Sequence, residues 1–281
     1  MIKLALVQPR AHAAPNDERN LADAVAHIDA AAAGGAEVVV FPETYPGPLT
    51  TPLRFDPGPS LQEAAARHRV YVVYGTLEPV DDDPRTAHNL ICLATPNGER
   101  TVAYRRTHPP GPWIYTGGTT WDFEYVAGDE PPPVAETELG VFGFAMCSEV
   151  YVPEVSRGLA LKGAEVIFLP AGNDKKRLYE TWRTLIFARA IENLAIVVTT
   201  QNIYGEERGL AMVASPEEIL LEVTEPGVHY VEVDLDRVRL LRAETDRIGC
   251  DLRHSVKPGL LTQWRRPELY EQLSSDAPVS T

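Results

Sequence analysis

Cys147 is the residue whose position in the sequence most clearly suggests chemistry. An apolar run over residues 140–146 ends at Cys147-Ser148-Glu149, and Pro153 lies where a following helix would begin. The N-terminal amides of a helix favour a thiolate and donate hydrogen bonds to an oxyanion. This pattern is typical of a nucleophile, although a small buried hydrophobic residue would explain it equally well.

Glu43 is the carboxylate that best suits a partner for such a thiol. It closes a second apolar run as Phe41-Pro42-Glu43, which places it at the carboxyl edge of a predicted strand, where α/β sheets build their sites. A carboxylate there can accept a proton and return it. A solvated glutamate at the end of a strand is the simpler interpretation.

A cysteine nucleophile needs a base, and the sequence offers two. Glu43 is one, and His108 would give a Cys–His pair of the thiol-protease kind. No Asn or Asp can be nominated to orient His108, and no local signature of that class surrounds Cys147. Spacing in sequence does not report proximity in space, so both stay candidates.

The other cysteines predict neither a disulfide framework nor a zinc site. Cys92 lies inside an apolar run and Cys250 in a polar tail, and the three cysteines contain no CxxC pair. We therefore expect no zinc cluster, and a reduced, cytoplasmic enzyme.

The elements that position these residues are short apolar runs alternating with helical patterns. The sequence predicts strands over 2–8, 36–43, 70–80, 88–95, 100–108, 140–146, 164–172 and 196–202. It predicts helices over 16–35, 60–69, 152–163 and 176–195. Asn16 and Ser60 are candidate N-caps, and Asn97-Gly98 predicts a hairpin. Antiparallel strands over 209–215, 219–224 and 229–235 close the pattern.

One unit of sequence occurs twice. Residues 34–43 read GGAEVVVFPE and residues 162–172 read KGAEVIFLPAG, each after a helical pattern. This repeat indicates internal pseudo-symmetry, with two sheets and helices outside them. No interdomain linker is evident, so we expect one domain over 1–245 and a polar, Pro-punctuated C-terminal arm over 246–281.

Composition excludes several classes of partner. The chain has 281 residues and a formal net charge of −14, which disfavours nucleic acid and anionic membrane surfaces. No apolar run approaches the roughly 18–20 residues of a membrane helix, and the N-terminal apolar run is too short for a signal peptide.

Taken in order, these motifs resemble the nitrilase superfamily of carbon–nitrogen hydrolases over roughly residues 2–240. The resemblance rests on Phe41-Pro42-Glu43, on residues 104–108, on Cys147, on Gly163-Ala164-Glu165 and on residues 189–193. It implies an α/β fold of the four-layer αββα sandwich type, with two mixed sheets, and a homodimer or higher homo-oligomer. It also implies hydrolysis of a small amide, nitrile or carbamoyl substrate through a cysteine thioester, with no metal and no organic cofactor.

The resemblance assigns roles residue by residue. Glu43 matches the general base and Cys147 the nucleophile, while the family's lysine is replaced by Arg106. Arginine stays charged, so it can stabilise an oxyanion but cannot shuttle a proton. Four further residues are candidates for substrate binding: the Ser148 amide in the oxyanion site, Glu149, Asn173 and Glu124. Glu124 and Asp122 both lie near the place of the family's second glutamate, and the loop alignment does not choose between them.

Three functions fit this pattern. The first is an amidase-type hydrolase, in which Arg106 holds the oxyanion and Glu43 manages both proton transfers. The second is an enzyme of the same layout that passes its acyl group to an acceptor other than water. The third is a catalytically inactive subunit, against which the presence of both Glu43 and Cys147 speaks.

Overall fold

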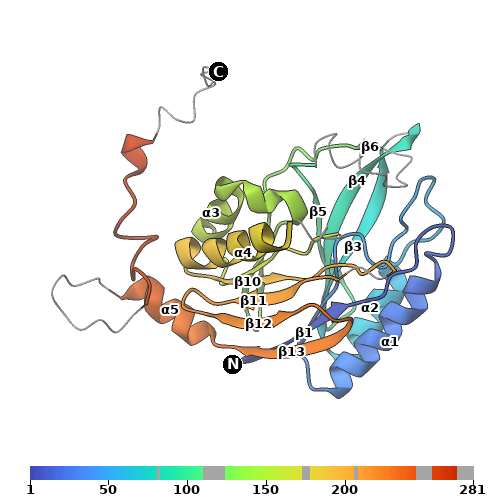
Figure 1. Cartoon of the computed structure of the whole chain (residues 1–281), viewed down its shortest axis with the longest axis horizontal. Helices are drawn as coiled ribbons and strands as arrows, with labels where there is room; N and C mark the ends of the chain where they lie inside the picture. Colours follow the sequence, from blue (N-terminus) through green and yellow to red (C-terminus); the bar gives the residue numbers. More distant parts are fainter. Residues whose placement is uncertain (81–82, 110–123, 173–177, 206–207, 245–254, 271–281) are drawn as a thin grey trace.

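The computed structural model describes residues 1–80, 83–109, 124–172, 178–205, 208–244 and 255–270. Two sheets pack face to face, with helices covering the outer face of each (Figure 1). Helices α1 (Arg19–Ala33) and α2 (Gly58–His68) cover the first sheet, and α3 (Pro153–Leu161) and α4 (Tyr179–Asn193) cover the second. The predicted αββα sandwich is confirmed.

The first sheet is built around a parallel trio of strands, β1 (Ile2–Gln8), β2 (Val38–Val40) and β3 (Tyr71–Val80). Beyond β3, the strands β4 (Asp83–Ala94) and β5 (Arg100–Arg105) form the hairpin that the sequence predicts. The short strand β6 (Glu124–Tyr125) pairs with β4, and β13 (Gly227–Val233) pairs with β1 on the opposite side.

The second sheet repeats this plan. Its parallel trio is β8 (Gly140–Phe144), β9 (Val166–Phe168) and β10 (Ile196–Thr199). The antiparallel strands β7 (Val134–Thr137), β11 (Ala211–Ala214) and β12 (Ile219–Val223) complete it. The two copies of the repeated sequence unit are β2 and β9 with their flanks, and each is the middle strand of a parallel trio, as the pseudo-symmetry predicts.

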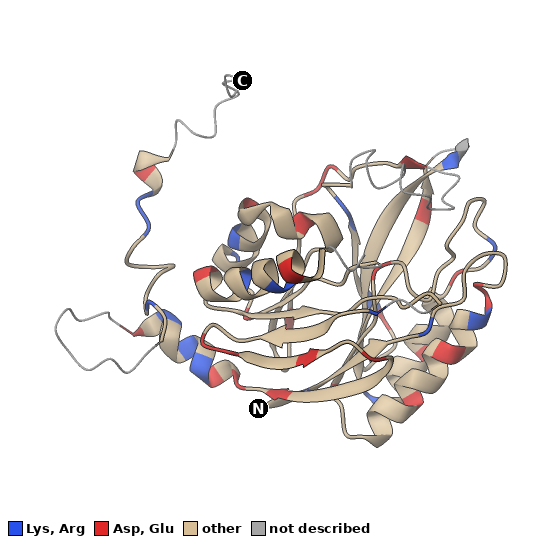
Figure 2. Ribbon diagram, in the orientation of Figure 1, with Lys and Arg blue, Asp and Glu red and all other residues tan. Residues whose placement is uncertain are grey.

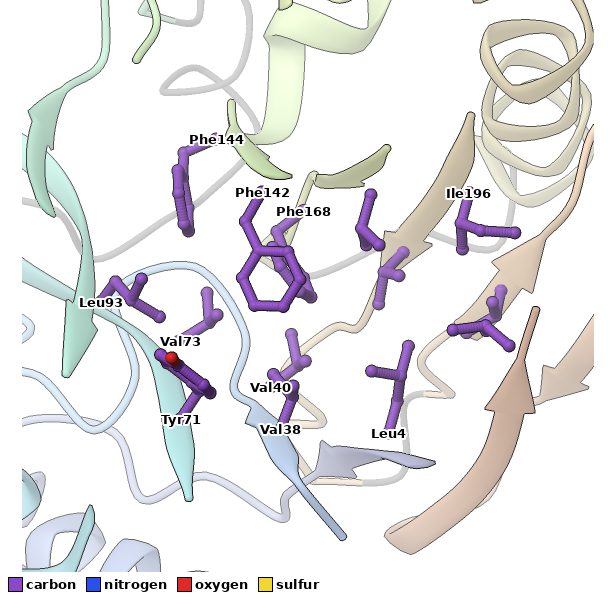
Figure 3. Packing of buried hydrophobic residues seen from close by; sticks show 14 of the residues in the cluster. Leu4, Val38, Val40, Tyr71, Val73, Leu93, Phe142, Phe144, Phe168 and Ile196 are labelled. Atoms are coloured by element: carbon purple, nitrogen blue, oxygen red, sulfur yellow. The ribbon is translucent and has the colours of Figure 1, made fainter. Parts of the chain in front are cut away.

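The core between the sheets consists of the side chains that alternate inward from both of them (Figure 3). Aromatic rings meet at its centre: the Phe142 ring lies edge-on to Phe168, with centroids 5.2 Å apart, and to Tyr71, at 5.8 Å. Such contacts add to the free energy gained by burying the rings. This core fixes how the two sheets pack on each other. As a result, the carboxyl ends of β2 and β8 lie at the same edge of the sandwich.

Two predicted helix starts are wrong. Helix α1 begins at Arg19 rather than after Asn16, and no side chain caps it. Helix α2 begins at Gly58, before Ser60, because Pro57 supplies helical backbone angles and the Asp56 carboxylate accepts the Gly58 N–H.

Helix α5 (Leu235–Ala243) fastens the end of the domain to the second sheet, and Figure 2 shows the basic residues along it. Arg242 donates hydrogen bonds to the carbonyls of Leu194 and Ala164, and Arg239 pairs with Glu165. The described part of the predicted arm, residues 255–270, starts against α5 through a Gly259 N–H to Leu241 carbonyl bond and then runs away from the sandwich (Figure 1). The domain boundary at 245 stays a prediction.

Candidate active site

The carboxylate of Glu43 lies at the carboxyl end of β2, where the sequence places it. The side chain is only 7% exposed. Its Oε1 atom accepts hydrogen bonds from Arg106 Nη1 and Asn89 Nδ2, both at 2.7 Å. Its backbone N–H bonds to the carbonyl of Ala171, which follows β9, so Glu43 is anchored to both sheets.

Arg106 follows β5 and is 1% exposed. Its backbone N–H extends the ladder to the Asn89 carbonyl. Burial acts to lower the pKa of the guanidinium, but its electrostatic interactions with Cys147, Glu43 and Glu149 outweigh that effect, and the pKa is raised above its ordinary value. The guanidinium is therefore a permanent cation inside the protein.

Cys147 occupies a sharp turn between β8 and α3. After β8 the chain enters a 3-10 helix, Cys147–Tyr151, for which the sequence gives no signal, and α3 then starts at Pro153 as predicted. Cys147 has a φ of 47°, a left-handed conformation that residues with a side chain seldom adopt. Its N–H bonds to the Pro170 carbonyl beyond β9, so β9 holds both Glu43 and Cys147.

The Cys147 thiol lies beside the Glu43 carboxylate, close enough for the two groups to interact electrostatically. Burial and the negative charge of Glu43 raise the pKa of the thiol to about 12, while the Arg106 charge and a backbone hydrogen bond from Gly172 oppose the rise. At neutral pH the sulfur therefore carries its proton beside a carboxylate. Glu43, Arg106 and Cys147 come from three separate segments and lie together.

Glu149 is fully buried and ties the cysteine turn to the segment after β5. Its Oε1 atom accepts hydrogen bonds from the Tyr104 hydroxyl at 2.6 Å and from the Thr107 N–H and hydroxyl at 2.9 Å. Its Oε2 atom accepts the Met146 N–H at 2.8 Å. These contacts describe a carboxylate that orients its neighbours; its predicted part in substrate binding stays a prediction.

The remaining predicted residues are placed differently from one another. The Ser148 hydroxyl contacts Arg106 Nη2, whereas Glu124 is exposed at the start of β6. Asn173 lies outside the described residues. His108, the alternative base, is half exposed and does not contact Glu43 or Cys147 by any described hydrogen bond; its carbonyl, rather than its ring, faces Arg106 Nε at 3.1 Å.

Several residues that build the site were missed in the sequence. Asn89 holds Glu43 Oε1 and accepts the Thr44 hydroxyl, and Asn202 donates to the Glu43 carbonyl at 2.9 Å. A Cβ at Gly172 would lie 3.1 Å from Glu43 Oε2. A usable signal existed for Asn89, a polar residue inside an otherwise apolar strand, but none distinguished Gly172 from an ordinary turn glycine.

A groove next to this cluster is lined mainly by apolar residues of α3 and by Pro131 and Pro132. It reaches Thr107 and His108, but Cys147 does not line it. We therefore do not assign it to the substrate of the cysteine.

Comparison with known proteins shows the family to which this sequence belongs. The sequence profile described as "Carbon-nitrogen hydrolase" matches residues 3–243, nearly the whole chain. The chain belongs to the carbon–nitrogen hydrolase family. The resemblance to the nitrilase superfamily is thereby confirmed, and the expected enzyme class is the class of this family.

Two curated relatives are amidases. The chain is 32% identical over 248 residues to a deaminated glutathione amidase of Synechocystis sp. The aligned region covers 82% of this chain and 91% of the relative. It is 30% identical over 236 residues to an (R)-stereoselective amidase of Pseudomonas sp., covering 77% and 80% of the two chains.

Solved structures share the fold. A cysteine-to-alanine mutant of the amidase from Nesterenkonia sp. AN1, in complex with butyramide, superposes with a TM-score of 0.72 at 22% identity, over 86% of this chain and 94% of that one. A mutant of the same amidase carries the acetamide moiety of fluoroacetamide on its active-site cysteine, with a TM-score of 0.72 at 21% identity, over 84% and 92% of the two chains.

Proposed function

We propose that the chain is an amidase that hydrolyses a small amide through a thioester on Cys147. The observation that carries the proposal is that the Cys147 thiol and the Arg106 guanidinium meet at one buried carboxylate, that of Glu43. The amidases among its relatives support the choice of an amide over a nitrile.

The first half of the reaction forms the thioester. As sulfur bonds to the amide carbon, its proton passes to Glu43, and the electrons of the C=O double bond move to oxygen. Glu43 Oε2 is the better acceptor, because Arg106 and Asn89 both occupy Oε1. Glu43 then gives the proton to the leaving nitrogen as the C–N bond breaks, and ammonia or an amine departs.

The second half releases the acid. Glu43 takes a proton from water as the water oxygen attacks the thioester carbon, and the C–S bond breaks. The departing thiolate recovers the proton from Glu43, and the carboxylic acid leaves. Because Arg106 keeps its proton throughout, Glu43 makes all of these transfers.

Arg106 and the Ser148 amide would stabilise the oxyanion. The guanidinium has five N–H groups. Three of them bond to Glu43, His108 and Ser148, and among the described residues no other acceptor is paired with the remaining two, which can serve a substrate oxygen. A fixed cation away from bulk water is well suited to a charge that develops only during the reaction.

Ammonia release from a panel of small aliphatic and aromatic amides tests the proposal. Wild-type protein should release ammonia in water alone, and Cys147→Ala should not. Product that forms only when an amine or hydroxylamine is added would instead indicate acyl transfer, the second candidate. No ammonia, no transfer product and no adduct on Cys147 would indicate an inactive subunit and overturn the proposal.

We also propose that the enzyme is a cytoplasmic homodimer or larger homo-oligomer. Tyr151, Leu161 and Ile191 expose apolar surface on the α3–α4 side of the second sheet. Within the described ranges no helix has the length and apolar character needed to cross a bilayer. Light scattering after size-exclusion chromatography tests the assembly, and a monomer at micromolar concentration would contradict it.

A further inference from the structure

Each of the three guanidinium nitrogens of Arg106 donates a hydrogen bond. Nη1 donates to Glu43 Oε1 at 2.7 Å, Nε donates to the His108 carbonyl at 3.1 Å, and Nη2 donates to Ser148 Oγ at 2.5 Å. The first contact is with the carboxylate of the site. The other two come from groups that touch neither Glu43 nor the thiol by a described hydrogen bond.

The proton of the Ser148 hydroxyl has a defined acceptor in this arrangement. Its one proton goes to the His108 carbonyl at 2.6 Å, so toward Arg106 it can act only as an acceptor. The same carbonyl accepts Arg106 Nε. Guanidinium, hydroxyl and carbonyl therefore close a ring in which every hydrogen bond has a defined direction.

We propose that the Ser148 hydroxyl is a positioning residue for Arg106, which holds the guanidinium against Glu43 and Cys147. Its effect on turnover rests on the function proposed above, whereas its effect on the thiol does not. This role differs from that of the Ser148 backbone amide, which faces substrate in the proposed mechanism.

The planar fork of arginine makes such a residue necessary. A lysine at this position would present one compact ammonium, which can satisfy Glu43 without reaching the serine and the carbonyl together. Without the Ser148 hydroxyl, Glu43 and the His108 carbonyl would still hold Nη1 and Nε, but Nη2 would lose its acceptor and the guanidinium would be less firmly oriented. Ser148 and Arg106 therefore act as a unit, and removing either one should remove the effect of the other.

Alkylation of Cys147 by iodoacetamide tests the pairing without any substrate. Glu43 and the Gly172 backbone face the thiol, and Glu149 and Tyr125 act on Arg106. Ser148→Ala should slow alkylation between about pH 8 and pH 10, because a loosened cation favours the thiolate less. In the Arg106→Lys background the same change should leave the rate unaltered. An equal effect in both backgrounds, or in neither, would overturn the proposal.

Turnover gives the second arm of the cycle. Ser148→Ala should lower kcat about tenfold, the loss of one hydrogen bond to a charged group, with KM changed less than about twofold. Ser148→Thr keeps the hydroxyl and should restore kcat, and Ser215→Ala, in the turn between β11 and β12, is the matched control. It can also happen that neither wild type nor any variant turns over an amide, while Ser148 and Arg106 still show coupling in the alkylation rates. The proposed amidase function is then wrong, and the pairing of Ser148 with Arg106 is supported.

Unfolding temperatures separate positioning from damage to the fold. All variants of the cycle should melt within a few degrees of their parent protein. A Ser148→Ala protein that loses kcat and alkylation rate only in proportion to its loss of folded protein would contradict a positioning role. Failure of Ser148→Thr to restore either rate would also contradict it.

Discussion

The buried pair of Glu43 and Arg106 determines what each residue of the site can do. Taking two opposite charges out of water is costly, and their contact at 2.7 Å offsets that cost only while both are present. Glu43 therefore stays close to a cation that never releases its proton. The thiol of Cys147 lies beside the same carboxylate. The pKa of the thiol therefore depends on whether Glu43 is charged.

Glu43→Gln should separate the reactivity of the thiol from catalysis. The negative charge of Glu43 helps to raise the pKa of Cys147 to about 12, so removing that charge should lower the pKa and increase the thiolate fraction at any pH below it. Iodoacetamide alkylation at about pH 8 should therefore speed up, while amide turnover falls about a hundredfold or more for lack of a base. Slower alkylation in this variant would contradict the charge assignment.

Arg106 should tolerate lysine better than alanine. Arg106→Lys keeps the charge beside Glu43 but loses the contacts to His108 and Ser148, so kcat should fall about tenfold. Arg106→Ala leaves a buried carboxylate unpaired. It should lower the free energy of unfolding by about 3–5 kcal/mol and should also remove measurable activity. Steady-state kinetics and denaturant titration measure both effects. Equal activity in all three proteins would exclude a role for the cation.

At the scale of elements, the site depends on how the segment after β5 is attached to the turn after β8. Glu149 makes this attachment with both of its oxygens. Glu149→Gln would replace one accepting carboxylate oxygen with an NH₂ group, which would face a hydrogen-bond donor. This should lower the free energy of unfolding by about 1–3 kcal/mol. Denaturant unfolding should detect the loss, and kcat should fall with it. Glu154→Gln, at the first turn of α3, is the matched control and should change neither.

The close approach of β3 to the segment after β2 also positions Glu43. A Cβ on Gly75 would lie 2.2 Å from the Thr44 backbone nitrogen, so the strand allows only glycine there. Gly75→Ala should displace Thr44 and Glu43, lowering stability by about 1–3 kcal/mol and lowering kcat. A Cβ at Gly158, in α3, would meet nothing within 4 Å, so Gly158→Ala should be neutral or slightly stabilising. Equal effects of the two substitutions would refute this account of β3.

At the scale of the whole molecule, the sequence predicts the layers better than the contacts. The apolar runs and the repeated unit predict two sheets because the sheet and helix periodicities are strong signals. They also place Glu43 and Cys147 at strand ends. The predicted helix starts at Asn16 and Ser60 are wrong: α1 begins at Arg19 without a side-chain cap, and α2 begins at Gly58, after Pro57 in helical geometry.

The contacts across the site could not be predicted in the same way. Asn89, Asn202 and Gly172 reach Glu43 from three different strands or strand ends, and no local pattern in sequence reports such a meeting. The choice of Glu43 over His108 as the thiol's partner likewise needed the packing of one sheet on the other. Pairing across the sandwich is a property of the tertiary fold and not of any one segment.

The most direct test of the central claim is the mass of the intact protein, acid-quenched during incubation with an amide that it turns over. An acyl adduct on wild type, mapped to Cys147 and labile to hydroxylamine, is the predicted result. The adduct should be absent from Cys147→Ala and should build up only slowly in Glu43→Gln. Turnover without an adduct on Cys147, or an adduct on another residue, would contradict the account.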